Sequence, residues 1–122
     1  MIETPSFGPT QEKIWGKTQL GFRFNSVEVH AIHIVAGGYC SCHSHANKWN
    51  RFIVLDGELE VLMYRDGRLV DTTILQREGI ADVPPGVIHK FYATKSSLVV
   101  ECYWSVLDGE DIDRHGTIGG VQ

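Results

Sequence analysis

Three histidines in this chain have the spacing to hold a metal ion. His43 and His45 stand two residues apart in the stretch CHSHANKWNRFIVLDG, and His89 follows the turn VPPGVI. Because successive side chains of a strand point to opposite faces, we expect His43 and His45 to share a face. A strand that begins at the second turn could bring His89 opposite to them. Imidazole nitrogens bind zinc, manganese, iron or nickel, so we expect one divalent metal ion here.

Two cysteines beside these histidines offer another interpretation, a compact zinc site. Cys40 and Cys42 are even-numbered, whereas the histidines are odd-numbered, so in a strand the two pairs face opposite sides. The Cys-x₂-Cys spacing typical of structural zinc sites is also absent. We therefore expect both cysteines to pack as small apolar side chains, under a covering strand or in a subunit contact.

Two further histidines, His30 and His33, precede this stretch. Their opposite parity means that they cannot both face the interior of a sheet protein. We expect each of them to lie on the surface or to be hydrogen-bonded, rather than to bind the metal.

Turn signals divide the chain into short segments that must position these residues. They recur about every ten residues, and they are Gly37-Gly38, Asp56-Gly57, Asp66-Gly67, Glu78-Gly79, Pro84-Pro85-Gly86 and Asp108-Gly109. Because Asp-Gly favours tight turns, we predict hairpins around Asp56-Gly57 and Asp66-Gly67. No segment of helical length has a helical period, so the chain is predicted to be all-β, a small sandwich or barrel.

Length and charge limit the partners that we expect. The chain has 122 residues, enough for one domain, and its 11 basic and 15 acidic side chains give a net charge of −4, so we expect no nucleic-acid partner. No apolar run approaches the roughly 18 residues of a membrane span, and the N-terminus lacks a signal-peptide core. We therefore expect no membrane partner and a cytoplasmic location, which the odd number of cysteines, three, also fits.

Two stretches of the sequence resemble the two motifs of the cupin family. The first is GGYCSCHSHANKWNRFIVLDG, in which four residues separate His45 from Asn50, and the second is GIADVPPGVIHKF, which contains His89. The resemblance implies a cupin-type jelly-roll β-barrel with a divalent metal in its mouth. It makes His43, His45 and His89 the ligands and places Asn50 at the position of a fourth one.

This resemblance also suggests how the chain is organised. We expect an N-terminal arm or edge strand at residues 1–19, the cupin β-barrel at residues 20–107, and a C-terminal extension at residues 108–122 that packs on the barrel.

The sequence departs from the cupin pattern in three places. Asn50 stands where the first motif usually has a glutamate ligand, the second motif is one residue short between Gly79 and Pro84, and Ala93 replaces its usual asparagine. An amide oxygen can bind a metal but carries no charge, so a bound ion would keep its full 2+ charge. Such a site is expected to favour an anionic substrate or hydroxide. Alternatively, Asn50 marks a site with weak metal affinity.

A carboxylate and two aromatic residues are candidates for substrate chemistry. Glu101 and Tyr103 share one face of the strand-like stretch LVVECYWSV, and Phe91 lies two residues after His89. If that face is the inner one, Glu101 is the candidate general base and Tyr103 a substrate contact; if it is the outer one, both are ordinary surface residues. Phe91 could stack on a ligand or simply fill the core.

The end of the chain is similar to the closing segment of the cupin domain in type II mannose-6-phosphate isomerases. The matching positions are Glu101, Gly109, Glu110, Asp111, Ile112 and Arg114. The similarity implies a metal-dependent sugar or sugar-phosphate isomerase or epimerase, in which Glu101 moves a proton and Arg114 holds an anionic group.

Two other functions remain open, a metal-dependent dioxygenase-type oxidoreductase and a non-catalytic cupin that binds a small carbohydrate. In each case the partner is a small sugar-like or anionic molecule. We also expect a homodimer, formed by adding strands to a sheet edge, with residues 1–13 as the exchanged element.

Overall fold

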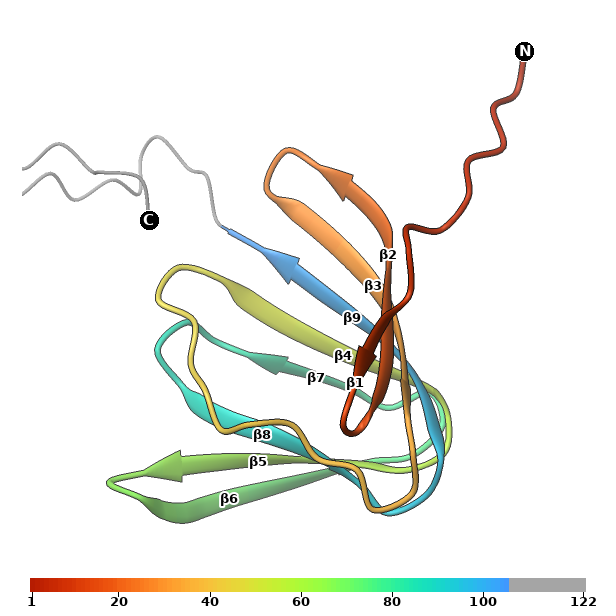
Figure 1. The fold of residues 1–122 in the computed structure, drawn as a ribbon. Coiled ribbons are helices and arrows are strands. Elements are labelled where there is room, and N and C mark those ends of the chain that lie inside the picture. Colours follow the sequence, from red (N-terminus) through yellow and green to blue (C-terminus); the bar gives the residue numbers. More distant parts are fainter. Residues whose placement is uncertain (106–122) are drawn as a thin grey trace, which may run out of the picture.

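Two antiparallel sheets that face each other make up the protein in the computed structural model, which describes residues 1–105 (Figure 1). The large sheet has the strand order β1-β2-β3-β9-β4-β7, and the small sheet has the order β6-β5-β8. The strands are β1 (Gln11–Lys13), β2 (Gly16–Phe24), β3 (Val27–Ile34), β4 (Trp49–Asp56), β5 (Leu59–Arg65), β6 (Arg68–Leu75), β7 (Ile80–Val83), β8 (Ile88–Ala93) and β9 (Ser97–Trp104). The predicted all-β jelly-roll fold is confirmed.

The core lies between the two sheets because alternate residues of each strand point inward. In β4, for example, Asn50, Phe52 and Val54 are buried, whereas the residues between them are partly exposed. The buried apolar residues are Ile32, Ile34, Cys40, Phe52, Val54, Leu59, Val61, Leu75, Val83, Phe91, Ala93 and Val99.

An irregular segment that follows β3 extends the small sheet beyond β8. Tyr39 bridges to Tyr92 and His43 bridges to His89, both antiparallel, so residues 37–43 lie alongside β8. Backbone hydrogen bonds hold this segment in place, among them His43 N–H to His89 O at 3.0 Å and His89 N–H to His43 O at 2.8 Å. The segment therefore brings its histidines to the inner side of the sheet.

One of the two predicted hairpins is confirmed and the other is wrong. β5 and β6 pair around Asp66-Gly67, whose positive φ angles of 52° and 74° fit the tight turn of a hairpin. Asp56-Gly57, in contrast, joins β4 in the large sheet to β5 in the small sheet. Gly57 is pressed against Ser97 there, where a Cβ atom would collide with the serine side chain. The chain therefore passes from the large sheet to the small sheet at this turn, and β4 and β5 do not pair as a hairpin.

The strands near the N-terminus can be compared with the predicted division of the chain into arm, barrel and extension. Strand β2 runs across residue 20, and β1 forms the edge of the large sheet, while Gly8 N–H donates to Leu20 O at 2.9 Å. The C-terminal extension expected at residues 108–122 lies outside the described residues. Within residues 1–105, no helix is long and apolar enough to cross a membrane.

Candidate metal centre

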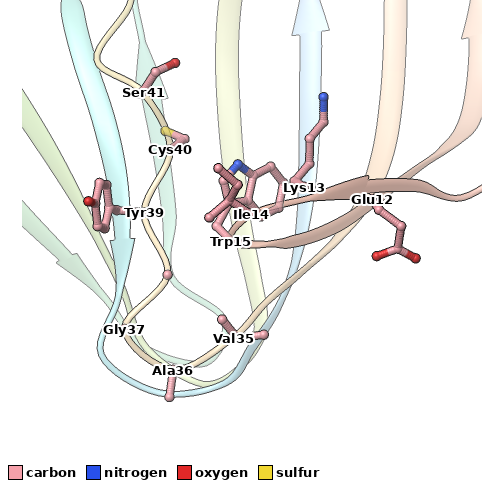
Figure 2. Close-up of a pocket in the computed structure, with 11 residues that line it drawn as sticks. Glu12, Lys13, Ile14, Trp15, Val35, Ala36, Gly37, Tyr39, Cys40 and Ser41 are labelled. Carbon is pink, nitrogen blue, oxygen red and sulfur yellow. The ribbon is translucent and has the colours of Figure 1, made fainter.

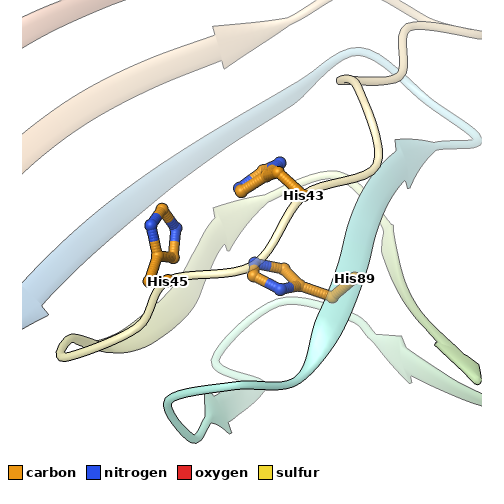
Figure 3. Close-up of side chains that lie close together, drawn as sticks. All are labelled: His43, His45 and His89. Atoms are coloured by element: carbon orange, nitrogen blue, oxygen red, sulfur yellow. The ribbon is translucent and has the colours of Figure 1, made fainter.

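His43, His45 and His89 converge between the two sheets (Figure 3). One ring nitrogen from each of them lies within 4.8 Å of the others. His89 comes from β8. His43 and His45 were predicted to lie on a strand, but they come from the irregular segment before β4. The two histidines of that segment still point to the same place, because the bridge between His43 and His89 fixes the start of the motif.

Backbone carbonyls determine which nitrogen of two histidines is free. His43 Nδ1 lies 2.7 Å from Ser41 O, and His89 Nδ1 lies 2.9 Å from Val87 O. Since a carbonyl oxygen only accepts hydrogen bonds, each Nδ1 carries the proton and each Nε2 keeps its lone pair. This is the arrangement that orients histidine ligands in metal sites.

His45 provides the test of whether a metal fits. Its Nε2 is buried and has no hydrogen-bond partner among the described residues. Burial, together with the neighbouring His43, His89 and Lys48, lowers the pKa of His45 to about 4, so the ring is neutral at pH 7. Three neutral imidazole nitrogens without other partners form a donor set that suits a divalent ion. Without an ion, the buried Nε2 of His45 has no partner, which costs folding free energy.

Asn50 joins this group from β4. Its side chain is fully buried, and Oδ1 lies 3.3 Å from Nε2 of His89. With Nε2 unprotonated, two lone pairs face each other there, and a cation between them would stabilise the contact. The Nδ2 group points the other way, 3.4 Å from both Glu101 Oε2 and Cys102 O. Asn50 is therefore placed to offer a neutral fourth ligand.

Glu101 lies on the inner face of the large sheet. Of the two positions that the sequence left open, the outer-face position is therefore wrong. It pairs with His30 of β3 and Phe52 of β4. Burial raises the pKa of the Glu101 carboxyl, while hydrogen bonds from Tyr103 and Asn50 lower it in part. Burial and the nearby Glu101 also raise the pKa of Tyr103, which therefore stays protonated and can donate to the carboxylate.

A cavity of about 360 Å³ joins His43, one of the three converging histidines, to this carboxyl group. The residues that line it are Lys13, Trp15, Thr18, His30, Cys40, Ser41, His43, Phe91, Glu101 and Tyr103. The predicted substrate contacts Phe91 and Tyr103 are thus both in its wall, whereas Arg114 lies outside the described residues.

His30 is a member of this wall that we expected only on the surface or in a hydrogen bond. Its Nε2 lies 2.9 Å from Glu28 Oε1, which also accepts from Arg23 at 3.2 Å. The hydrogen bond was expected, but the position in the cavity was missed. The even-numbered Ile32 and Ile34, both buried, share the face of His30 and would have indicated that it points inward.

A wider groove of about 690 Å³ opens beside the cavity, between the β1–β2 turn and residues 35–41 (Figure 2). It shares Lys13, Trp15, Cys40 and Ser41 with the cavity. Trp15 packs edge-on against Phe91, with 5.0 Å between the ring centroids. The groove extends the space around the candidate metal centre toward an apolar surface.

The two cysteines of the motif are separated. Cys40 is buried in the core, where its sulfur accepts from Phe91 N–H at 3.2 Å, and Cys42 is exposed. Packing as a small apolar side chain is therefore confirmed for Cys40, while a subunit contact remains a prediction for Cys42. Among residues 1–105, the group of potential ligands that converges consists of the three histidines, with neither cysteine.

The sequence matches no protein-family model and no curated protein. Its fold, however, matches solved structures. KdgF from Halomonas sp. has 18% sequence identity and a TM-score of 0.70, and the match covers 88% of this chain and 99% of that chain. An RmlC-like cupin from Shewanella frigidimarina has 19% identity and a TM-score of 0.67, with 81% and 85% of the chains covered.

A variant of oxalate decarboxylase from Bacillus subtilis is also similar, with 11% identity and a TM-score of 0.70. That match covers 80% of this chain and 27% of the larger one. The chain therefore has the cupin fold, and the three histidines give it a group that could bind a metal ion.

Proposed function

We propose that this protein is a metal-dependent enzyme that isomerises or epimerises a small sugar-like substrate, with Glu101 as its general base. One observation carries the proposal: Glu101 and His43 line the same cavity, so a substrate in this cavity can lie beside both a candidate metal ligand and the buried carboxyl group. Burying a carboxyl group on the inner face of a sheet costs folding energy, which favours a functional role.

The residues divide the chemistry between them. A divalent ion held by His43, His45 and His89, with Asn50 as the neutral fourth ligand, would polarise a carbonyl or hydroxyl oxygen of the substrate. Glu101 would take the proton from the carbon next to the carbonyl, leaving the electron pair of that C–H bond on the substrate. For isomerisation it would return the proton to the carbonyl carbon while the hydroxyl proton of the first carbon moves to the former carbonyl oxygen, and for epimerisation a proton would return to the opposite face of the first carbon. Hydrogen bonds from Tyr103 and Asn50 hold the carboxyl group in position.

The charges at the site favour an anionic substrate. Three neutral imidazoles and one amide leave the charge of a divalent ion uncompensated by its ligands, and the positive charge of Lys13 in the cavity wall offsets the negative charge of Glu101 as general base, so the net charge stays positive. Arg114 remains our candidate for a second contact to an anionic group. A sugar phosphate would meet these requirements, and the aromatic rings of Trp15 and Phe91 offer flat apolar surfaces for a sugar ring.

Oxidative chemistry is the second candidate, because three imidazoles also suit iron, copper or nickel, metals that can activate oxygen. One structural neighbour is named as a decarboxylase of oxalate, a small chelating anion, which fits the same charge argument. Consumption of oxygen with turnover would favour this candidate over isomerisation.

The test begins with protein purified without chelator. Elemental analysis is expected to find one transition-metal ion per chain, and a thermal-shift screen of sugars and sugar phosphates is expected to select an anionic ligand. Turnover of that ligand should disappear after chelation and return when the same metal is added back. Full activity in metal-free protein would refute the proposal, and binding without turnover under any metal would identify a non-catalytic binding protein instead.

A further inference from the structure

We propose that His30 is a second catalytic residue, which carries the hydroxyl proton between the two oxygen atoms of the substrate during isomerisation. The proposal rests on the function proposed above, in which Glu101 moves the proton of the C–H bond. Isomerisation also requires a proton to leave the hydroxyl group of the first carbon and to reach the former carbonyl oxygen. Since Glu101 holds the carbon-bound proton at that stage, a second acid–base group favours this transfer.

His30 lies directly beside Glu101 on the inner face of the large sheet. The two residues are partners across the ladder of β3 and β9, and both side chains line the cavity. Residues that oppose each other in an antiparallel pair have Cβ atoms about 4.5–5.5 Å apart. A substrate carbon that reaches the carboxyl group of Glu101 therefore has its attached oxygen within reach of the imidazole ring.

Glu28 determines which nitrogen of His30 is available to a substrate. His30 Nε2 lies 2.9 Å from Glu28 Oε1. Because a carboxylate only accepts hydrogen bonds, Nε2 carries the ring proton. The ring lines the cavity, and among residues 1–105 its hydrogen-bond partner is this carboxylate alone, at Nε2. The lone pair of Nδ1 is therefore left to accept the hydroxyl proton.

The carboxylate of Glu28 also stabilises the charge that His30 gains during the transfer. Arg23 Nη2 lies 3.2 Å from the same Oε1 atom, and the hydrogen bonds from Arg23 and His30 lower the pKa of Glu28. An ionised carboxylate behind an imidazole holds the ring in one orientation and stabilises the imidazolium form, as it does in serine-protease triads. Glu28 is therefore a positioning residue for His30.

The other titratable groups of the cavity wall suit this step less well. Tyr103 donates its hydroxyl hydrogen to Glu101. Burial raises the pKa of the Cys40 thiol to about 11, so this group stays protonated and does not accept a proton at neutral pH. His43 belongs to the candidate metal centre. Lys13 is an exposed residue of the edge strand β1, so its ammonium group is not fixed beside the carboxyl group as the imidazole ring is.

The position of His30 also predicts which product forms. Glu101 and His30 project from one wall of the cavity, so both protons are moved on one side of the substrate. Epimerisation would need a proton donor on the opposite side, and Lys13 would be the candidate for it. We therefore expect the isomer, a ketose from an aldose, and not the epimer.

The test follows the two protons separately by NMR in D₂O. The probes are mannose 6-phosphate, glucose 6-phosphate and ribose 5-phosphate, each incubated with the metal-loaded protein. His30→Gln should lower ketose formation by ~10²–10³, while exchange of the carbon-bound hydrogen in recovered substrate, which depends on Glu101, should fall less than about threefold. The matched control is His33→Gln, because His33 is exposed on the other face of β3, and it should leave both rates unchanged.

The outcomes separate this proposal from the function on which it rests. Ketose formation that is unchanged in His30→Gln, or that falls only as much as the exchange does, would overturn the role of His30. An epimer as the main product of the unsubstituted protein would overturn it as well. If the unsubstituted protein gives neither exchange nor product with any probe, the proposed function itself is refuted, and the role of His30 with it.

The ring nitrogens of His30 provide a second measurement, which needs neither metal nor turnover. In metal-free protein at about pH 8, where imidazoles are ordinarily neutral, ¹H–¹⁵N NMR is expected to find the proton of His30 on Nε2 and a lone pair on Nδ1. The signal is assigned by its loss in the His30→Gln variant. A proton on Nδ1 would overturn the proposal, because that nitrogen could then not accept the hydroxyl proton.

Discussion

The two walls of the cavity differ in what they offer a substrate. The small-sheet wall, formed by β8 and the irregular segment beside it, carries the three imidazoles that could hold a metal ion. The large-sheet wall carries Glu101, which accepts a hydrogen bond from Tyr103, and His30, whose Nε2 lies 2.9 Å from Glu28 Oε1. Asn50 reaches across, with its oxygen toward His89 and its nitrogen toward Glu101. Separate walls allow metal binding and proton transfer to be altered one at a time.

The largest effect is expected from removing the buried ligand of the metal wall. His89→Ala should weaken metal affinity by at least ~100-fold, more than the 10–100-fold typical of lost supporting contacts, because it deletes a donor atom. Elemental analysis of protein purified without chelator measures this effect. The control is His33→Ala, because His33 is exposed on β3 and points away from the core. This variant should retain full metal content. Full metal content in the His89→Ala variant would show that His89 is not a metal ligand.

The opposite wall should lose activity and keep its metal. Glu101→Gln preserves the shape of the side chain and its contact with Asn50 but cannot accept a proton, so turnover should fall by ~10²–10⁴. The metal content should not change. Glu60→Gln, on the outer side of the small sheet, should behave as the unsubstituted protein does. Equal losses of metal and activity in Glu101→Gln would show that the two walls do not act separately.

Asn50 allows the junction of the two walls to be tested. Asn50→Asp places a negative charge at the atom that faces Nε2 of His89, so metal affinity should rise about tenfold, a gain of ~1.4 kcal/mol. Competition with a chelator measures it. Asn47→Asp adds the same charge in the exposed loop nearby and controls for long-range attraction. Equal gains in both variants would mean that Asn50 is not in contact with the ion.

The smallest effect is expected at the edge of the large-sheet wall. Hydrogen bonds from Arg23 and His30 lower the pKa of Glu28, so this carboxylate stabilises the fold above its ordinary pKa of 4.5, and the stabilisation is lost as the pH falls through the lower value of the folded state. Because the group is partly exposed, Glu28→Gln should cost only about 0.5–1 kcal/mol at pH 7. Urea unfolding should show no difference between the two proteins at pH 2. A difference that persists there would mean that packing, and not charge, stabilises this cluster.

Local signals in the sequence predicted some turns better than others. Asp66-Gly67 closes a hairpin as expected, whereas the same dipeptide at residues 56–57 leads from one sheet to the other. The backbone angles that a dipeptide prefers do not determine which strand the chain meets afterwards. That depends on how Gly57 packs against Ser97, a contact between residues forty positions apart.

The metal site was predicted in part for the wrong reason. The parity of a strand predicted that His43 and His45 would share a side, and they converge, but they do so from an irregular segment held to β8 by hydrogen bonds. The position of Glu101 could not be predicted at all. Strand β9 is apolar on both faces, with Val99 inside and Val100 outside, so no alternation showed which side points inward.

The pairing of Glu101 on both sides has an evolutionary consequence. His30 on one neighbouring strand and Phe52 on the other fix its place in the ladder. Losing or gaining one residue upstream in β9 would present Val100 or Cys102 to the substrate and turn the acid toward the opposite surface. We therefore expect insertions and deletions to be tolerated at turns such as Asp66-Gly67 and not within the central strands.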